Sequence, residues 1–353
     1  MTTEPLPDED SPSDGPVDTD LTLGHPADDG FLTPSAGMVL HRVLARTSRA
    51  FLLNDLASEP VEEDTQDCEA VDAVSVRTGP RPLWAKTAAS ALDATQRGKT
   101  ETDRIHQSRV ALRRIRSNLR TFRLALDPAW GTSLRAELAW YGGRLGESRD
   151  LHIMGEIVSG HGPEVMDPEQ VALLQSEVEA RMAAAMAGIE AERGGARRFQ
   201  LTEQMMVLWN GPAFKPKASR PAEEVLPPML HRAWHDLRGA SRTARKEPSE
   251  ANLHKLRIRL KDLRYGCETV ALVEGGPARK TAKAAERLQS KLGDLHDAWF
   301  SISWLEDLAR TRPDLAEPID QLVLVQHGAA ASARKGWKRE LKEVERRWRG
   351  WQG

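Results

Sequence analysis

A histidine followed by a row of basic residues occurs twice in the sequence. Residues 105–116 read IHQSRVALRRIR and residues 253–264 read LHKLRIRLKDLR. At 100° per residue, the cations of each segment share one arc of a helix, beside an apolar arc. Arginine binds phosphate oxygens through a planar fork, lysine adds a flexible positive charge, and histidine adds a donor near neutral pH. The candidate anion-binding residues are His106, Arg109, Arg113, Arg116, Arg120, His254, Arg257, Lys261 and Arg264.

Such rows of like charges need negative partners, because cations at i,i+3 and i,i+4 repel by roughly 0.2–0.5 kcal/mol per pair. The partner can be an external anion, or carboxylates of neighbouring helices. Candidate internal partners are Glu147, Asp150, Asp294 and Asp297. Because the rows recur with histidine at their head, ligand binding is favoured over an interface made only of salt bridges, which stays open as the alternative.

The repeat extends beyond these two segments. LGESRD at residues 145–150 matches LGDLHD at 292–297 with nearly the same offset, 147 against 148. MVLHR at 38–42 matches PMLHR at 228–232 with an offset of 190, which fits an insertion of about forty residues in the first copy. Three matches in the same order predict an internal duplication.

The elements that carry these motifs are predicted to be helices throughout. Aromatic residues make up only 5% of the chain, and nothing is typical of a strand. The predicted organisation is a disordered acidic leader at 1–33, a first half at 34–193 with an acidic insertion at about 58–101, and a second half at 196–348. Breaks at Gly and Pro give helices at about 34–57, 84–97, 102–126, 131–158, 168–193, 196–210, 221–246, 250–273, 277–310 and 315–348.

Charge is divided unevenly along the chain. Residues 1–72 hold 17 acids, three Arg and no Lys, whereas the remainder holds 35 acids and 47 bases, a net of +12. A basic body suggests an anionic partner. No signal peptide or membrane-spanning run is recognised, and Cys68 and Cys267 are expected to be unpaired thiols, which together predict a cytoplasmic protein.

A third helix carries weaker candidates. His231, His235 and Arg238 share one arc of the segment 221–246, so this helix could join the binding surface. The spacing of the two histidines could also seat a metal ion, but no third ligand lies nearby, so no metal site is predicted.

Four blocks of this sequence resemble the CHAD family, the conserved-histidine α-helical domain. They are IHQSRVALRRIRSNLRTF at 105–122, LGESRDLHI at 145–153, LHKLRIRLKDLRY at 253–265 and LQSKLGDLHDA at 288–298. The resemblance spans about 34–348 and implies two pseudo-symmetric four-helix bundles with a basic groove between them. It also implies binding of inorganic polyphosphate, in several members at polyphosphate granules, and adds Arg149 to the candidate ligands.

The sequence departs from this pattern in the long acidic insertion, in Asp262, and in Glu268, which stands where the first copy has Arg120. The strand with Glu-x-Glu-x-Lys that marks a fused triphosphate-tunnel domain is missing.

Other functions remain open. Repeated carboxylates at Asp150 and Asp297 leave room for an enzyme acting on phosphoanhydrides or nucleotides, although no catalytic constellation is found. A general binder of nucleic acid would use the same cations, and metal storage is the weakest reading. No cofactor is predicted, apart from divalent cations that polyphosphate itself carries, and the oligomeric state is left open.

Overall fold

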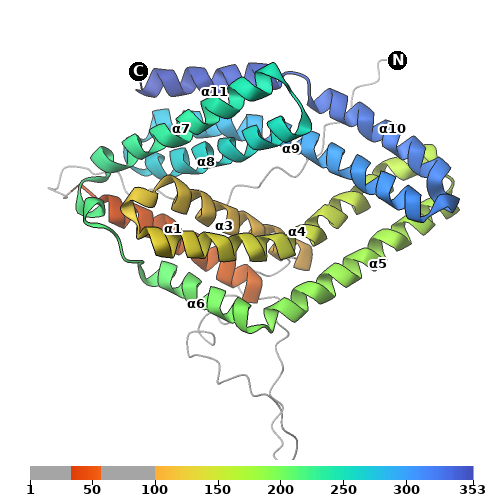
Figure 1. Cartoon of the computed structure of the whole chain (residues 1–353), viewed down its shortest axis with the longest axis horizontal. Coiled ribbons are helices and arrows are strands. Elements are labelled where there is room, and N and C mark those ends of the chain that lie inside the picture. The colour runs from red at the N-terminus through yellow and green to blue at the C-terminus, as the bar shows by residue number, and fades with distance from the viewer. Residues whose placement is uncertain (1–32, 57–99, 353) are drawn as a thin grey trace, which may run out of the picture.

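The computed structural model describes residues 33–56 and 100–352, and in this part of the chain no strand forms. The predicted all-α class is therefore confirmed (Figure 1). The leader up to residue 32, the helix expected at 84–97 and nearly all of the acidic insertion lie outside the described residues.

Local signals begin several helices where the sequence places them. Thr100 and Asp103 form a reciprocal capping box at the start of one helix, and Asp127 caps the next, whose first residue is Pro128. Asp167 caps a third in the same way. The first five helices are α1 (Ala36–Leu56), α3 (Glu101–Thr121), α4 (Pro128–Val165), α5 (Pro168–Arg193) and α6 (Ala196–Asn210).

The second set of helices follows the same order. They are α7 (Ala222–Lys246), α8 (Glu250–Glu274), α9 (Gly276–Thr311), α10 (Ala316–Ala333) and α11 (Trp337–Gln352).

Two predicted boundaries are wrong. The break expected at Gly160 to Pro163 is absent, since α4 runs on to Val165. Pro163 lies in the last turn, where it removes one hydrogen bond close to the helix end, and Gly162 packs closely against Val171 of α5. Conversely, the helix expected at 315–348 is split into α10 and α11 by a turn ending at Gly336, whose φ of 81° is a conformation that favours glycine.

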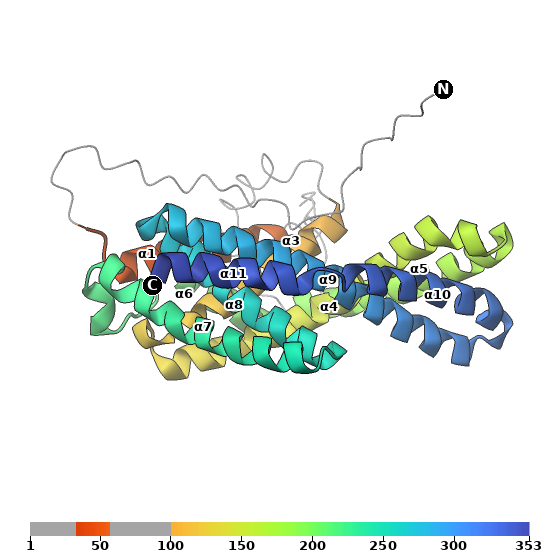
Figure 2. The same ribbon diagram turned by 90° about the horizontal axis from the view of Figure 1, so that it is seen from above.

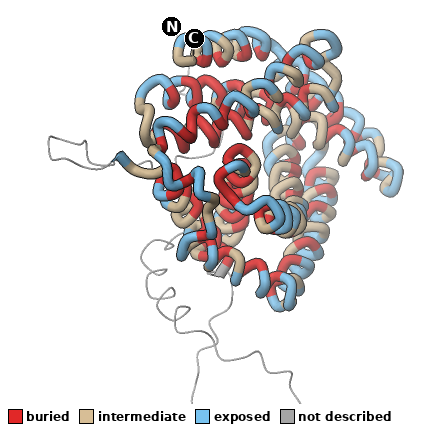
Figure 3. Tube along the Cα trace, turned by 60° about the vertical axis from the view of Figure 1, so that its left-hand side comes forward, coloured by how far each residue is buried: buried red, intermediate tan, exposed pale blue. Residues whose placement is uncertain are grey.

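Three apolar cores hold the helices together, and Figure 3 shows their buried faces turned inward. Helices α1, α3, α4 and α6 surround the first core, which includes Leu112, Tyr141 and Met205. Helices α7, α8, α9 and α11 surround the second, so each half contains a bundle of four helices. The far ends of α4, α5, α9 and α10 share a third core, which forms the separate end of the molecule in Figure 2.

Helix α6 packs with the first half, although residues 196–348 are predicted to form the second half. Its Leu201 and Leu208 lie in the first core. At the junction of α6 with α1, Arg198 is ion-paired with the buried Asp55, which also accepts a hydrogen bond of 2.7 Å from the Tyr141 hydroxyl. This internal ion pair ties α6 to the end of α1.

Helices α3 and α8 meet through reciprocal contacts between the two halves. Arg114 bonds Glu268 at 3.0 Å, and Arg120 bonds Asp262 at 2.7 Å. With the repeat offset of 148, position 114 corresponds to 262 and position 120 to 268, so each pair is the image of the other. Reciprocity of this kind is what a twofold contact between two copies requires. It supports the predicted duplication and explains Asp262 and Glu268, which supply opposite charge across the axis.

Candidate anion-binding site

The cations of α3 lie along the edge of its buried face. Leu112, Ile115 and Leu119 are fully buried in the first core, while Arg109, Arg113, Arg116 and Arg120 are half-buried beside them. Because an apolar arc anchors the helix, the neighbouring guanidinium groups are held in a fixed row about 16 Å long, at 1.5 Å per residue.

The arginine of each repeat lies against the glycine of the following motif. Arg109 donates from Nη1 to the carbonyl oxygen of Gly146 at 3.1 Å. In the second half, a Cβ on Gly293 would lie 3.4 Å from Nη2 of Arg257, whereas on Gly146 it would lie 3.8 Å from Arg109. Both distances are ordinary van der Waals contacts, so the arginine packs closely against this glycine but does not require it.

The two halves converge where α4 meets α9. Burial raises the pKa of Asp297, whereas the charges of Arg257 and Arg149 lower it. Arg149 of the first half therefore acts on a carboxyl of the second half. Burial likewise raises the pKa of Asp150, and Asp297 raises it further. We call this group the central site: Arg109, Arg113, Arg149, Asp150, His254, Arg257, Lys261, His296 and Asp297.

The charge of Arg109 in the central site is partly removed from water. Burial and the charge of Arg113 lower the pKa of Arg109 to about 10, while Asp150 and Asp297 oppose the shift. Arg109 therefore stays protonated at neutral pH, and its charge is poorly solvated. A poorly solvated cation gains more from an arriving anion than one already in water.

Two imidazoles pack together in the second half of the site. The ring centroids of His254 and His296 are 4.8 Å apart. The Nδ1 atoms of both rings are buried without a hydrogen-bond partner among the described residues. Burial, Arg257, His254 and Lys261 lower the pKa of His296 to about 4. Burial and the charges of Arg257 and Lys261 also lower the pKa of His254. Both rings are therefore neutral at pH 7.

The cationic row continues from α3 onto α4 through a residue that the sequence pattern does not single out. Burial and the charge of Arg120 lower the pKa of Arg135, and burial, Arg120 and Arg135 lower that of Arg116. Arg135 therefore extends the row on the first half. It lies outside both repeated motifs, and no pattern in the sequence distinguishes it from other surface arginines.

Arg264 is not displayed as the repeat suggested. Its side chain is 5% exposed and is bound by Glu268 at 2.9 Å and Glu286 at 2.5 Å. Its counterpart, Arg116, forms no ion pair with a carboxylate in the described residues, although the charge of Asp262 acts on it. Arg120 is also engaged, by Asp262, although its side chain is 27% exposed. The second row of cations thus ends at Lys261. His106 is half-buried near the start of α3. Two hydrogen bonds with Thr100 are the main cause of the lowered pKa of Asp103, and the charge of the nearby His106 lowers it further.

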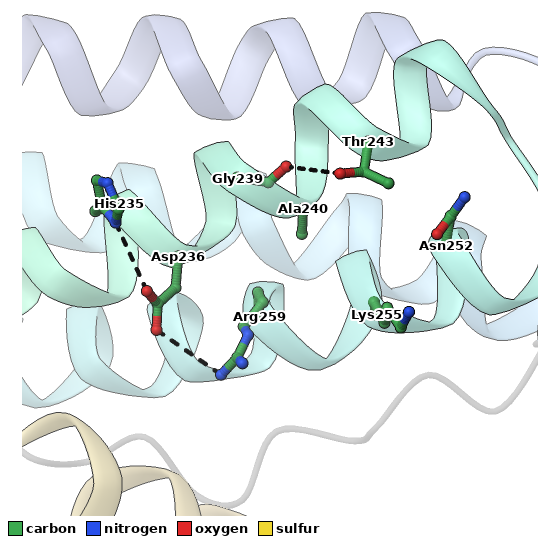
Figure 4. Close-up of a pocket in the computed structure, with 8 residues that line it drawn as sticks. All are labelled: His235, Asp236, Gly239, Ala240, Thr243, Asn252, Lys255 and Arg259. Atoms are coloured by element: carbon green, nitrogen blue, oxygen red, sulfur yellow. Dashed lines mark hydrogen bonds and ion pairs between the residues drawn. The ribbon is translucent and has the colours of Figure 1, made fainter.

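The three weaker candidates on α7 do not join the central site. His231 packs edge-on against Trp348 of α11 at 5.7 Å. His235 lines a hollow of about 340 Å³ between α7 and α8, where Asp236 lies 3.7 Å from it and 3.8 Å from Arg259 (Figure 4). Arg238 faces α11 across a different groove.

Comparison with known proteins identifies the family. The CHAD domain model matches residues 85–306. The chain belongs to the CHAD domain family. Its fold is similar to that of PptA from Streptomyces chartreusis, with a TM-score of 0.63, 19% identity, and coverage of 88% of this chain and 100% of that chain. It is also similar to the CHAD domain of the plant Ricinus communis, with a TM-score of 0.60, 18% identity, and coverage of 89% and 92%. None of the curated proteins matches.

The family confirms the resemblance seen in the four sequence blocks, and the matched range includes the cationic rows, the glycine motifs and the central site of this CHAD domain. In the described part of the chain, no helix is long and apolar enough to cross a bilayer. Nor do three or more His, Cys, Asp or Glu side chains gather there as metal ligands. Cys267 is a buried free thiol, while Cys68 lies outside the described residues.

Proposed function

We propose that this CHAD domain binds inorganic polyphosphate at its central site without catalysing a reaction on it. The observation that carries the proposal is the convergence of Arg109, Arg149 and Arg257 from both halves, in a partly desolvated place with two carboxyls of raised pKa. A group of poorly solvated cations attracts an arriving anion strongly, because opposite charges interact more strongly where water is partly excluded.

The shape of the cationic surface favours a long anion over a single phosphate. The row on α3 spans about 16 Å and continues to Arg135 of α4. A chain with evenly spaced charges can contact successive guanidinium groups along this row, and each contact is a charge-assisted hydrogen bond. The same proposal places the protein in the cytoplasm, on polyphosphate granules. It also includes divalent cations carried by the ligand.

The direct test is titration with long-chain polyphosphate and with RNA of matched charge at several salt concentrations. Arg113→Ala/Lys261→Ala should weaken polyphosphate binding by roughly 150- to 25,000-fold, since each of the two charged contacts contributes about 1.5–3 kcal/mol. A matched control is Arg310→Ala/Lys280→Ala, which removes the same charge at exposed positions of α9, each about 20 Å along that helix from the central site.

Binding that survives RNA competition and is lost only in the first double variant supports the proposal. Equal binding of both anions would instead indicate a general polyanion surface, and no binding would mean that the cations serve internal ion pairs.

A second candidate, an enzyme acting on phosphoanhydrides, follows from the meeting of Asp150 and Asp297. Two carboxyls beside arginines could bind Mg²⁺ next to a phosphate chain. The charges of Arg109 and Arg257 act on these two carboxyls. Carboxyls that interact with arginines are better suited to orienting the guanidinium groups than to binding Mg²⁺. Release of phosphate from polyphosphate or nucleotides, measured with and without Mg²⁺, distinguishes the two functions.

A further inference from the structure

A second basic groove lies between α7 and α11, on helices that contribute nothing to the central site. Helix α11 lies at the outer edge of the molecule, beside α7 (Figure 1). The groove has a volume of about 320 Å³. Its lining residues are Trp234, Arg238, Ser241, Arg242, Arg245, Glu345 and Arg349.

Three of its four arginines are free of internal ion pairs within the described chain. Arg238, Arg242 and Arg349 are exposed, and no carboxylate there bonds them. Arg238 and Arg242 are spaced i,i+4 on α7, so they repel one another. Arg349 reaches the same groove from α11. The three guanidinium groups therefore form a cluster of uncompensated positive charge drawn from two helices.

The fourth arginine holds a carboxylate in the groove. Arg245 bonds Glu345 at 2.9 Å, and the Glu345 side chain is 19% exposed. A carboxylate accepts hydrogen bonds and repels phosphate. A ligand that is phosphate along its whole length would be opposed here, whereas a ligand with hydroxyl or amine donors at one end would be bound.

The aromatic wall of the groove is held rigidly. Trp234 stacks on Trp348 at 4.9 Å with an interplanar angle of 14°, and Trp348 in turn packs against Trp351 at 5.5 Å. An indole packed in this way offers a surface to a flat ring, because nucleobases stack favourably on aromatic side chains.

We propose that the α7–α11 groove binds a nucleoside di- or triphosphate. Guanidinium groups of Arg238, Arg242 and Arg349 take the phosphates through forked hydrogen bonds. Trp234 contacts the base, and Glu345 accepts from hydroxyl or amino groups of the nucleoside. The volume lies at the lower end of the range of small-molecule sites, which suits one nucleotide rather than a polymer. This site is independent of the polyphosphate proposal.

The test is calorimetric titration of the full chain with ATP and with tripolyphosphate. Arg242→Ala/Arg349→Ala should weaken ATP binding by roughly 150- to 25,000-fold, since two charged contacts are lost, whereas Arg310→Ala/Lys280→Ala, which removes exposed charge on α9, should leave it unchanged. Trp234→Leu should weaken ATP and not tripolyphosphate. Arg346→Ala is the matched control, since it removes an exposed cation of α11 that is bonded instead to Glu343 at 2.7 Å.

Three results would overturn the proposal. The first is no ATP binding by the wild type. The second is ATP binding that is lost in the central-site double variant and kept in the groove double variant. The third is tripolyphosphate binding to the groove as tightly as ATP, because the base and Glu345 would then play no part.

Discussion

Two buried imidazoles connect anion binding to pH at the scale of single residues. In the free protein, burial and the charges of Arg257 and Lys261 lower the pKa of both His254 and His296, that of His296 to about 4. The charge of Glu250 opposes the shift of His254. A bound phosphate adds negative charge, so it raises the imidazole pKa and binding takes up a proton.

The affinity for polyphosphate should therefore rise as pH falls from 8 to 5. If the pKa of one histidine returns to its ordinary value of about 6.5 in the complex, affinity at pH 5 exceeds that at pH 8 by roughly 30-fold. Titrations across this range measure it, with His254→Asn/His296→Asn expected to flatten the profile. His327→Asn, an exposed histidine of α10, is the control. A double variant with the slope of the wild type would contradict the mechanism.

Residue identity alone could not predict which cations face a ligand. Arg116 and Arg264 occupy the same place in the repeat, yet Arg264 is buried between Glu268 and Glu286 while Arg116 is not. Glu286 lies 22 residues further along the chain, on α9, so only the packing of α8 on α9 brings it to Arg264. Arg135 was missed for a similar reason, because its neighbours come from another helix.

Helices were predictable where periodicity and capping agree, as for α3 and α5. Prediction failed where packing overrides a local signal. Gly162 and Pro163 resemble a helix end, yet α4 continues through them and packs against α5. The turn between α10 and α11 contains no proline, and the sequence does not show that Gly336, unlike other glycines, adopts a positive φ. The apolar period of α6 gave no indication of which half it packs on.

The contact between α3 and α8 yields a prediction at the scale of elements. The side chain of Asp262 accepts hydrogen bonds from Arg120 at 2.7 Å and from Ser117 at 3.0 Å. Asp262→Ala removes both, so the free energy of unfolding should fall by about 1–3 kcal/mol. The same change leaves the charge of Arg120 uncompensated beside Arg116, so polyphosphate affinity at low salt should rise. Urea unfolding and titration measure the two effects separately.

A matched control for this change is Asp320→Ala, which removes an exposed carboxylate of α10. Its effect on unfolding should stay within about 0.5 kcal/mol. If Asp262→Ala proved as stable as this control, the reciprocal ion pairs would not hold the two halves together.

Charge distribution over the whole molecule sets the last expectation. Residues 1–72 carry 17 acids and three bases, whereas the remainder has a net charge of +12. An acidic segment tethered to a basic body competes with an external polyanion at an effective concentration in the millimolar range. Deleting residues 1–33 should therefore tighten polyphosphate binding at low salt, and the difference should shrink as salt rises because screening weakens both attractions.

The deletion removes nine acids and no Lys or Arg, so its effect needs a control for net charge alone. A chain whose nine acids in this segment are replaced by Asn and Gln keeps the length and removes the charge. Tighter binding by both variants indicates electrostatic competition by the leader, and tighter binding by the deletion alone indicates steric obstruction. Unchanged affinity in both would show that the leader does not act on the central site, since a tethered competitor must weaken binding whenever it occupies the same cations.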